Sequence, residues 1–236
     1  MQRRAITLLP ALLVLALVLL AIGGCGSSSS SGNGVASKSP SEILAASKTA
    51  ADSASSVHVS GSLKNNGTPI TLNLSLVSGH GGRGQISQGS LSFNLIVVGD
   101  TIYLKGSPAF YSHFGGSAAA QLFQGKWLKA PASGGELGSL ATLTNFTQLL
   151  AQTLASHGTL VKGSTSTVAG TPVIELRDTS NNGSLFVATT GKPYPIQIVK
   201  HGSETGHITF TDWDKPVSLS APPGAIDLSQ LEQSAH

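Results

Sequence analysis

Three clusters in this sequence combine residue types that could support chemistry, and the first is rich in glycine. Gly79-His80-Gly81-Gly82-Arg83-Gly84 matches the dinucleotide-binding pattern G-x-G-x-x-G letter for letter. That pattern binds a phosphate only where the third glycine opens a helix and an acidic residue follows about 20 positions later. The next residues, Gln85-Ile86-Ser87-Gln88-Gly89, are not typical of a helix start. The sequence therefore predicts a mobile hairpin loop here and no phosphate site.

The second cluster contains two histidines. His201 and His207 flank Gly202-Ser203-Glu204-Thr205-Gly206. If this segment is a hairpin loop, the two imidazoles could bind a metal ion with Glu204 as a third ligand. Polar residues around an exposed turn are the ordinary case, so we expect no metal site.

The third cluster is a pair of carboxylates, Asp212 and Asp214, on either side of Trp213. On a strand the two would share a face, but a two-carboxylate acid/base site needs burial to separate the two pKa values. The adjacent Lys215 indicates a solvated, neutralised turn instead. The chain also has no G-x-S-x-G nucleophile turn. We therefore expect no catalytic residue and no cofactor, and an extracytoplasmic enzyme is the least supported hypothesis.

The residue with the clearest chemistry is Cys25, the only cysteine in the chain. Arg3 and Arg4 precede an apolar run over residues 8–22, in the order that is typical of a secretory signal. The run is short for a membrane span, which needs about 20 apolar residues. Leu20-Ala21-Ile22-Gly23-Gly24-Cys25 resembles the lipobox of bacterial lipoproteins. This resemblance implies that the signal is cut before Cys25 and that the sulfur carries a diacylglycerol. The alternative is an uncleaved anchor followed by a chance cysteine, and both place the rest of the chain outside the cytoplasm.

Composition separates the chain into three parts. Residues 1–24 are the predicted lipoprotein signal peptide, residues 25–39 a Gly/Ser-rich tether, and residues 40–236 a single domain of ordinary size. The chain has 14 basic and 11 acidic residues. Loss of Arg3 and Arg4 with the signal would leave 12 basic residues, since 14 − 2 = 12, so the two charges nearly balance. Charged residues make up 11% of the chain, against about 25% in an average domain, and they form no basic stripe. We therefore expect no nucleic-acid partner.

Periodicity predicts the elements of the domain. Ser39-Pro40-Ser41-Glu42 forms a capping box that starts a helix over residues 40–55. A second, strongly amphipathic helix is expected over residues 139–156, and residues 106–125 form a loop or short helices. Strands are predicted at 57–64, 70–76, 83–88, 91–98, 101–105, 125–129, 159–164, 171–178, 184–190, 194–201, 207–213 and 215–219.

Together these elements define the fold class as α+β, with a single long antiparallel sheet of about eleven strands. A sheet of that length must curl, so we expect a half-barrel with helices covering its concave face. Apolar stripes on two strands and on the second helix would then line a cavity for a ligand: Leu72, Leu74, Leu76, Leu91, Phe93, Leu95, Leu143 and Leu150.

Several motifs carry a family resemblance that covers nearly all of the chain after Cys25. Ile208-Thr209-Phe210-Thr211-Asp212-Trp213-Asp214-Lys215-Pro216-Val217, followed by Ala221-Pro222-Pro223, is similar to the closing strand of the mycobacterial LppX, LprA, LprF and LprG lipoproteins. Gly99-Asp100-Thr101-Ile102-Tyr103-Leu104, Gly125-Lys126-Trp127 and Gly191-Lys192-Pro193-Tyr194-Pro195 match as well. The resemblance implies a curved half-barrel whose concave face encloses an apolar cavity for acylated lipids or glycolipids. This chain departs from the family in its many Gly and Ser residues and in a first helix with few large aliphatic side chains.

These observations lead to one favoured hypothesis and one alternative. The favoured hypothesis is a monomeric lipoprotein, anchored to the membrane through acylated Cys25, that carries a lipid or glycolipid through the cell envelope, with an envelope transporter as a conceivable partner. The alternative is a surface-anchored structural or protein-binding module with a solid core. The two differ in whether helices fill the concave face of the sheet or leave a cavity.

Overall fold

The computed structural model of the chain describes residues 32–65, 67–133, 135–202 and 205–234. These residues form one unit that begins at Gly32. All four clusters of buried apolar side chains lie between Val35 and Leu228, so this unit contains a complete core of its own. Cys25, the signal segment and Glu204 lie outside the described residues.

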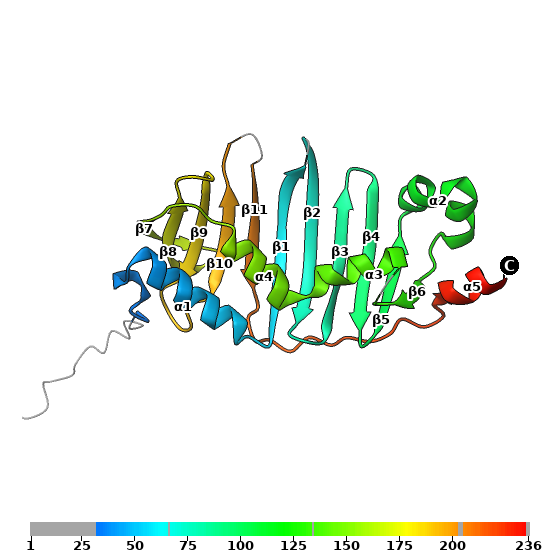
Figure 1. The fold of residues 1–236 in the computed structure, drawn as a ribbon, viewed down its shortest axis with the longest axis horizontal. Coiled ribbons are helices and arrows are strands. Elements are labelled where there is room, and N and C mark those ends of the chain that lie inside the picture. Colours follow the sequence, from blue (N-terminus) through cyan, green and yellow to red (C-terminus); the bar gives the residue numbers. More distant parts are fainter. Residues whose placement is uncertain (1–31, 66, 134, 203–204, 235–236) are drawn as a thin grey trace, which may run out of the picture. The chain divides into compact units, whose positions relative to one another are not determined.

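A single open sheet of twelve strands forms the body of this unit (Figure 1). Its order is β12-β6-β5-β4-β3-β2-β1-β11-β10-β9-β8-β7, and every pairing is antiparallel except that of β12 with β6. The predicted α+β half-barrel with about eleven strands is therefore confirmed, with one short parallel strand added at the edge. The strands are β1 Ser56–Asn65, β2 Thr68–Val77, β3 Gly81–Gln88, β4 Leu91–Val98, β5 Thr101–Gly106, β6 Leu128–Pro131, β7 Leu160–Val168, β8 Thr171–Asp178, β9 Gly183–Ala188, β10 Pro195–Lys200, β11 Gly206–Thr211 and β12 Ile226–Asp227.

Helices cover one face of the sheet, as expected for the concave side. In Figure 1, α1, α4 and α3 cross in front of the strands, while α2 lies near the β5 and β6 edge. Within the described residues, no helix combines the length and the apolar character that a membrane span requires. The helices are η1 Val35–Ser37, α1 Pro40–Asp52, α2 Pro108–Phe123, α3 Gly135–Ala141, η2 Thr142–Thr144, α4 Phe146–Ala155 and α5 Leu228–Ser234.

The first helix forms as its sequence predicts. The Ser39 hydroxyl accepts from the Glu42 amide while the Glu42 carboxylate accepts from the Ser39 amide, at 3.4 and 2.9 Å. This reciprocal pair satisfies donors that a helix start otherwise leaves without partners. Ile43, Ser47 and Ala50 of α1 are buried, and the small residues let the helix lie close to what it covers.

The tether predicted over residues 25–39 does not extend to residue 39. Asn33 donates from its backbone amide to the Thr189 carbonyl at 2.8 Å, and its side chain donates to the Ala188 carbonyl at 3.0 Å. Val35 is 2% exposed and belongs to the core beneath α1. The buried Val35 side chain and the hydrogen bonds of Asn33 therefore hold this part of the predicted tether on the sheet.

The single helix predicted over residues 139–156 is wrong, because the chain forms α3, η2 and α4 in succession. Thr142 and Thr144 donate from their hydroxyls to the carbonyls of Ser139 and Ala141, at 2.6 and 2.8 Å. Asn145 then accepts from the Gln148 amide and starts α4 as its N-cap. Such local side-chain bonds compete with a continuous helix and favour caps and turns.

Two other local predictions are also wrong. The segment read as a hairpin loop at Gly79 to Gly84 is mostly strand, because Gly81–Gln88 is β3 and pairs along its length with both β2 and β4. The strand predicted at residues 215–219 has no regular structure. Figure 1 shows this part of the chain running along the lower ends of the strands toward β12, and Pro216 has no amide to donate to a ladder.

Candidate functional site

An apolar cavity of about 320 Å³ lies between the central strands and the segment formed by η2 and α4. We call it the central cavity. Its volume is at the lower end of the range of about 300–1,000 Å³ that is typical of ligand sites. Thirteen side chains line it, all of them apolar: Val59, Ile70, Leu72, Leu74, Leu76, Ile86, Phe93, Leu143, Phe146, Leu149, Leu150, Ile208 and Phe210.

Strand register arranges one wall of the central cavity as a row across five strands. Phe93 of β4 pairs with Ile86 of β3, which pairs with Leu72 of β2. Leu72 pairs with Gly61 of β1, and Gly61 pairs with Ile208 of β11. Gly61 has no side chain, and a Cβ atom there would lie 2.1 Å from the His207 carbonyl oxygen, so the backbone of β11 comes close to β1 at this point of the row. Glycine within a strand often marks a place where another group approaches the backbone closely.

The glycines of β3 shape the same wall in a different way. A Cβ atom at Gly84 would lie 2.1 Å from the Asn73 carbonyl oxygen and 2.8 Å from Cδ2 of Leu74. A Cβ atom at Gly82 would lie 2.8 Å from Cδ2 of Leu76. The two leucine side chains therefore lie against the bare backbone of β3. The motif that resembles a phosphate loop in sequence thus serves to pack the cavity wall.

The cavity has a buried inner end and a partly exposed outer end. Leu74, Leu76, Phe146 and Leu150 are at most 4% exposed. The outer residues are half-buried and lie toward the turn between β1 and β2 and toward α2: Ile70, Leu72, Ile86, Phe93, Leu143, Leu149 and Ile208. A ligand chain would therefore enter between Leu149 and the outer ends of β2, β3 and β4.

The structure brings six of the eight residues predicted for the ligand site together in this lining: Leu72, Leu74, Leu76, Phe93, Leu143 and Leu150. Leu95 instead lies fully buried in a separate cluster with Val97 and Ile102, under α3. Leu91 stands outside the lining, at the start of β4 opposite Gln88. The apolar stripe on β4 is therefore longer than the cavity. On the Leu95 side the cavity ends because α3 fills the space above that residue.

Several lining residues were not identified from the sequence as parts of one site. Val59, Ile208 and Phe210 come from β1 and β11, which pair although they are about 150 positions apart in the chain. Their alternation with polar residues could have been noticed, but no local pattern shows that β11 lies beside β1.

The carboxylate pair near the C-terminus holds the chain in place. The Asp214 carboxylate accepts from the Tyr194 hydroxyl at 2.5 Å, from the Lys192 ammonium at 2.9 Å and from the Ser55 amide at 2.9 Å. These hydrogen bonds, that of Tyr194 first, hold the pKa of Asp214 well below its ordinary value. Asp212 is bonded separately to Lys215 at 2.6 Å. The two carboxylates do not share a strand face, since β11 ends at Thr211 and each has a positive φ.

Trp213, between these carboxylates, closes the end of the core beside the cavity. Its ring stacks on Tyr194 with centroids 4.3 Å apart and an interplanar angle of 1°. It also contacts Phe146 at 5.8 Å and Phe210 at 6.1 Å, both of which line the central cavity. The Asp-Trp-Asp segment therefore fastens the wall of the cavity, which is a structural role.

The two histidines lie on either side of the hairpin between β10 and β11. Both border a shallow polar hollow on the sheet surface, and His201 Nε2 lies 3.5 Å from the Ser184 hydroxyl. Among the residues that the structure describes, no three His, Cys, Asp or Glu side chains are grouped closely enough to hold a metal ion.

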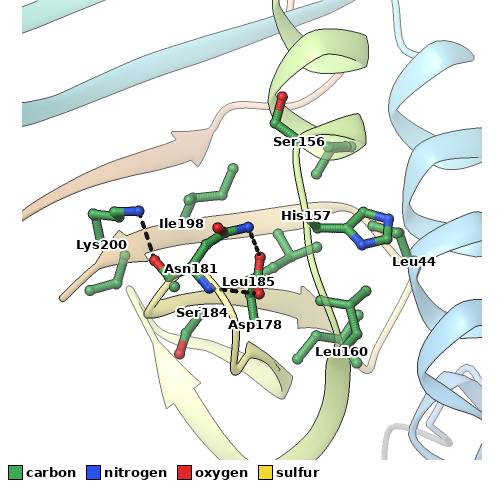
Figure 2. Close-up of a pocket in the computed structure, with 14 residues that line it drawn as sticks. Leu44, Ser156, His157, Leu160, Asp178, Asn181, Ser184, Leu185, Ile198 and Lys200 are labelled. Carbon is green, nitrogen blue, oxygen red and sulfur yellow. Dashed lines mark hydrogen bonds between the residues drawn. The ribbon is translucent and has the colours of Figure 1, made fainter.

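A second cavity, of about 290 Å³, lies toward the β7 edge of the sheet and shares no lining residue with the central cavity. Figure 2 shows its polar rim, where the Asn181 side chain points to Asp178 and Lys200 reaches the Asn181 carbonyl at 2.7 Å. The Asp178 carboxylate also accepts from the Gly158 amide at 2.8 Å. These polar groups are thus occupied with one another, whereas the side chains that line the central cavity are all apolar. The central cavity is therefore the better candidate for a ligand site.

The sequence matches no family model and no characterised protein. Solved structures do match. LprF from Mycobacterium bovis aligns with a TM-score of 0.54 at 14% identity, over 78% of this chain and 97% of that one. The Mycobacterium tuberculosis lipoprotein LppX aligns with a TM-score of 0.48 at 17% identity, over 76% of this chain and 99% of that one. The chain thus has the LprF-type fold, which confirms the fold that the sequence motifs implied.

Proposed function

We propose that the protein is an extracytoplasmic lipoprotein, anchored by acylated Cys25, that binds the acyl chain of a lipid or glycolipid in the central cavity and carries it through the cell envelope. The observation that carries this proposal is the central cavity itself, with thirteen apolar lining residues and a partly exposed outer end. The lipobox resemblance at Cys25 and the fold shared with LprF support it.

The size of the cavity sets what it can take. A cavity of about 150 Å³ lined by apolar side chains binds benzene, so about 320 Å³ accommodates roughly a dozen carbon atoms. At about 0.8 kcal/mol for each buried methylene, such a chain gains about 10 kcal/mol. Association itself costs an estimated 4–15 kcal/mol or more. At the lower end of that cost the net gain is about 6 kcal/mol, a moderate affinity that suits a carrier that must also release its ligand.

The absence of polar lining groups determines the kind of specificity. With no hydrogen-bonding side chain in the cavity wall, only chain length and shape can distinguish ligands there. The headgroup would remain at the outer end, outside the apolar space. We therefore propose a binding protein and no enzymatic activity, since the carboxylates with catalytic potential serve to hold the chain.

The test is to identify what the protein carries. Residues 25–236 with Cys25→Ser, exported in the native host behind a secretory signal that is not of the lipoprotein type, should yield an acylated lipid on extraction and mass spectrometry. The delipidated protein should then take up a fluorescent fatty-acyl probe. A protein that contains no lipid and binds no such probe would refute the carrier proposal in favour of the module with a solid core.

A further inference from the structure

Helix α2 differs from the other helices because no part of the chain that the structure describes covers its middle. Residues 112–118 are all exposed, and Phe114 and Leu122 expose 69% and 52% of their surfaces. The whole helix, Pro108–Phe123, contains no Asp, Glu, Lys or Arg. Single exposed apolar residues are ordinary on soluble proteins. A run of sixteen residues without a charge, with a phenylalanine and a leucine facing out, is not.

The two ends of α2 are fastened while its middle projects. The Tyr111 hydroxyl accepts from the Gly106 amide at 2.9 Å and donates to the Lys126 carbonyl at 3.4 Å. The Tyr111 ring also packs on Phe123, with centroids 5.8 Å apart. Between these anchors the helix bends at Gly116, whose φ of 73° is left-handed. We call the exposed part, residues 112–118 with Leu122, the α2 tip.

Positive charge lies at the base of the α2 tip. Lys126 supplies a backbone partner of Tyr111, so it stands where the helix is anchored. Lys105, next to Gly106 on β5, lies instead on the face of that strand opposite the buried Leu104 and Gly106. None of the ion pairs among the described residues involves either lysine. Nearby Asp227 is already paired with Lys129 at 3.2 Å. An apolar tip with a cation at its base that makes no ion pair among the described residues is complementary to an anionic lipid surface, which has an apolar interior beneath negative phosphates.

The α2 tip is also connected to the central cavity through aromatic rings. Phe93, in the cavity lining, lies 5.2 Å from Phe110 between ring centroids, and Phe110 lies 4.8 Å from Phe114. Apolar surface therefore runs without interruption from the outer end of the cavity to the most exposed aromatic side chain. In Figure 1, α2 lies beside the same ends of β4 and β5.

We propose that α2 docks the protein onto a lipid bilayer, with Phe114 and Leu122 inserted below the headgroups and Lys126 against anionic phosphates. This places the outer end of the central cavity against the membrane. The α2 tip shares no residue with the lining of the central cavity, so the test of docking does not depend on whether the cavity holds a lipid.

The experiment measures sedimentation of residues 25–236 with Cys25→Ser, which lack the anchor, with vesicles made of equal parts phosphatidylglycerol and phosphatidylcholine. Phe114→Ser and Leu122→Ser should each lower the partition coefficient about tenfold, the change expected on withdrawing one large apolar side chain from the apolar phase. Lys126→Gln should lower it about fivefold on these vesicles and leave it unchanged on pure phosphatidylcholine. Val161→Ser is the matched control, because Val161 is 38% exposed on β7 at the opposite edge of the sheet and should have no effect.

Each other outcome overturns the proposal. One is that the unaltered chain stays in the supernatant with anionic vesicles. Another is that Phe114→Ser and Leu122→Ser sediment as well as the unaltered chain. A third is that the chain is a dimer in solution, becomes monomeric with Phe114→Ser and ignores vesicles, which would make the α2 tip a contact between two copies. Because both side chains are exposed, melting curves of the variants should match that of the unaltered chain.

Discussion

Replacement of Leu72 by tryptophan tests the central cavity most directly. Leu72 is half-buried in the middle of the row that forms the cavity wall, between Ile86 and Gly61. An indole there adds about six heavy atoms, roughly half of what the cavity accommodates by comparison with the benzene-binding case. Losing room for about six methylenes at about 0.8 kcal/mol each lowers the binding free energy by up to about 5 kcal/mol. Because the outer end is open and a chain can shift outward, we expect a rise in Kd of at least about a hundredfold, or about 3 kcal/mol.

The assay is displacement of a fluorescent fatty-acyl probe, read beside a thermal melt that reports whether each variant folds. Asn73→Trp is the matched control, because it adds the same indole one residue away on the exposed opposite face of β2. Its Kd should equal that of the unaltered protein. If Leu72→Trp folds and binds the probe with an unchanged Kd, the cavity is not the binding site and the reasoning fails.

Three further predictions concern the anchor, the helix above the cavity and the C-terminal clamp. Cys25→Ser in the full chain should leave an uncleaved precursor or release the protein from the membrane, and cell fractionation would contradict the lipobox assignment if the variant were processed and retained like the unaltered protein. Leu150→Asp should cost about 3 kcal/mol and lower Tm by roughly 6–12 °C, because it places an unpaired charge at a site that is 3% exposed. Gln152→Asp, on the exposed side of α4, should leave Tm nearly unchanged, and equal melting of the two variants would show that α4 does not pack on the sheet. The hydrogen bond from Tyr194 and the other donors hold the pKa of Asp214 below its ordinary value of 3.8, so its stabilisation is complete above about pH 4 and is lost as the pH falls below that. Asp214→Asn should therefore lower Tm at neutral pH and have a smaller effect in acid, and a Tm loss that is equal at both would exclude this role.

The elements that formed as predicted are those whose causes are local. The capping box at Ser39 and Glu42 starts α1 because each group bonds a neighbour three residues away. The meander from β1 to β5 follows from alternating apolar residues and short turns, since both act between adjacent strands. The fold class required nothing beyond these regularities and the length of the sheet.

The errors arose where a local pattern allowed two outcomes. The apolar period over residues 139–156 suits one long helix, but the hydroxyls of Thr142 and Thr144 and the cap at Asn145 divide it. The glycines at 82 and 84 suit a loop, but both lie in β3. The side chains of Leu74 and Leu76 occupy the space that a Cβ atom would need at these two positions. In the first case hydrogen bonds between residues three positions apart decided between two conformations, and in the second case the packing of neighbouring strands did.

The position of the cavity was decided by tertiary structure alone. Leu74 and Leu95 have the same pattern in sequence and stand in one row, each paired with Gly84. Leu95 is enclosed because α3 packs directly on it. Leu74 lines the cavity because η2 and α4 leave a space above it. The sequence by itself therefore determined that one face of the sheet is apolar. Which part of that face stays open depends on where the broken helix crosses it and on the pairing of β1 with β11, contacts between residues far apart in the chain that no local period encodes.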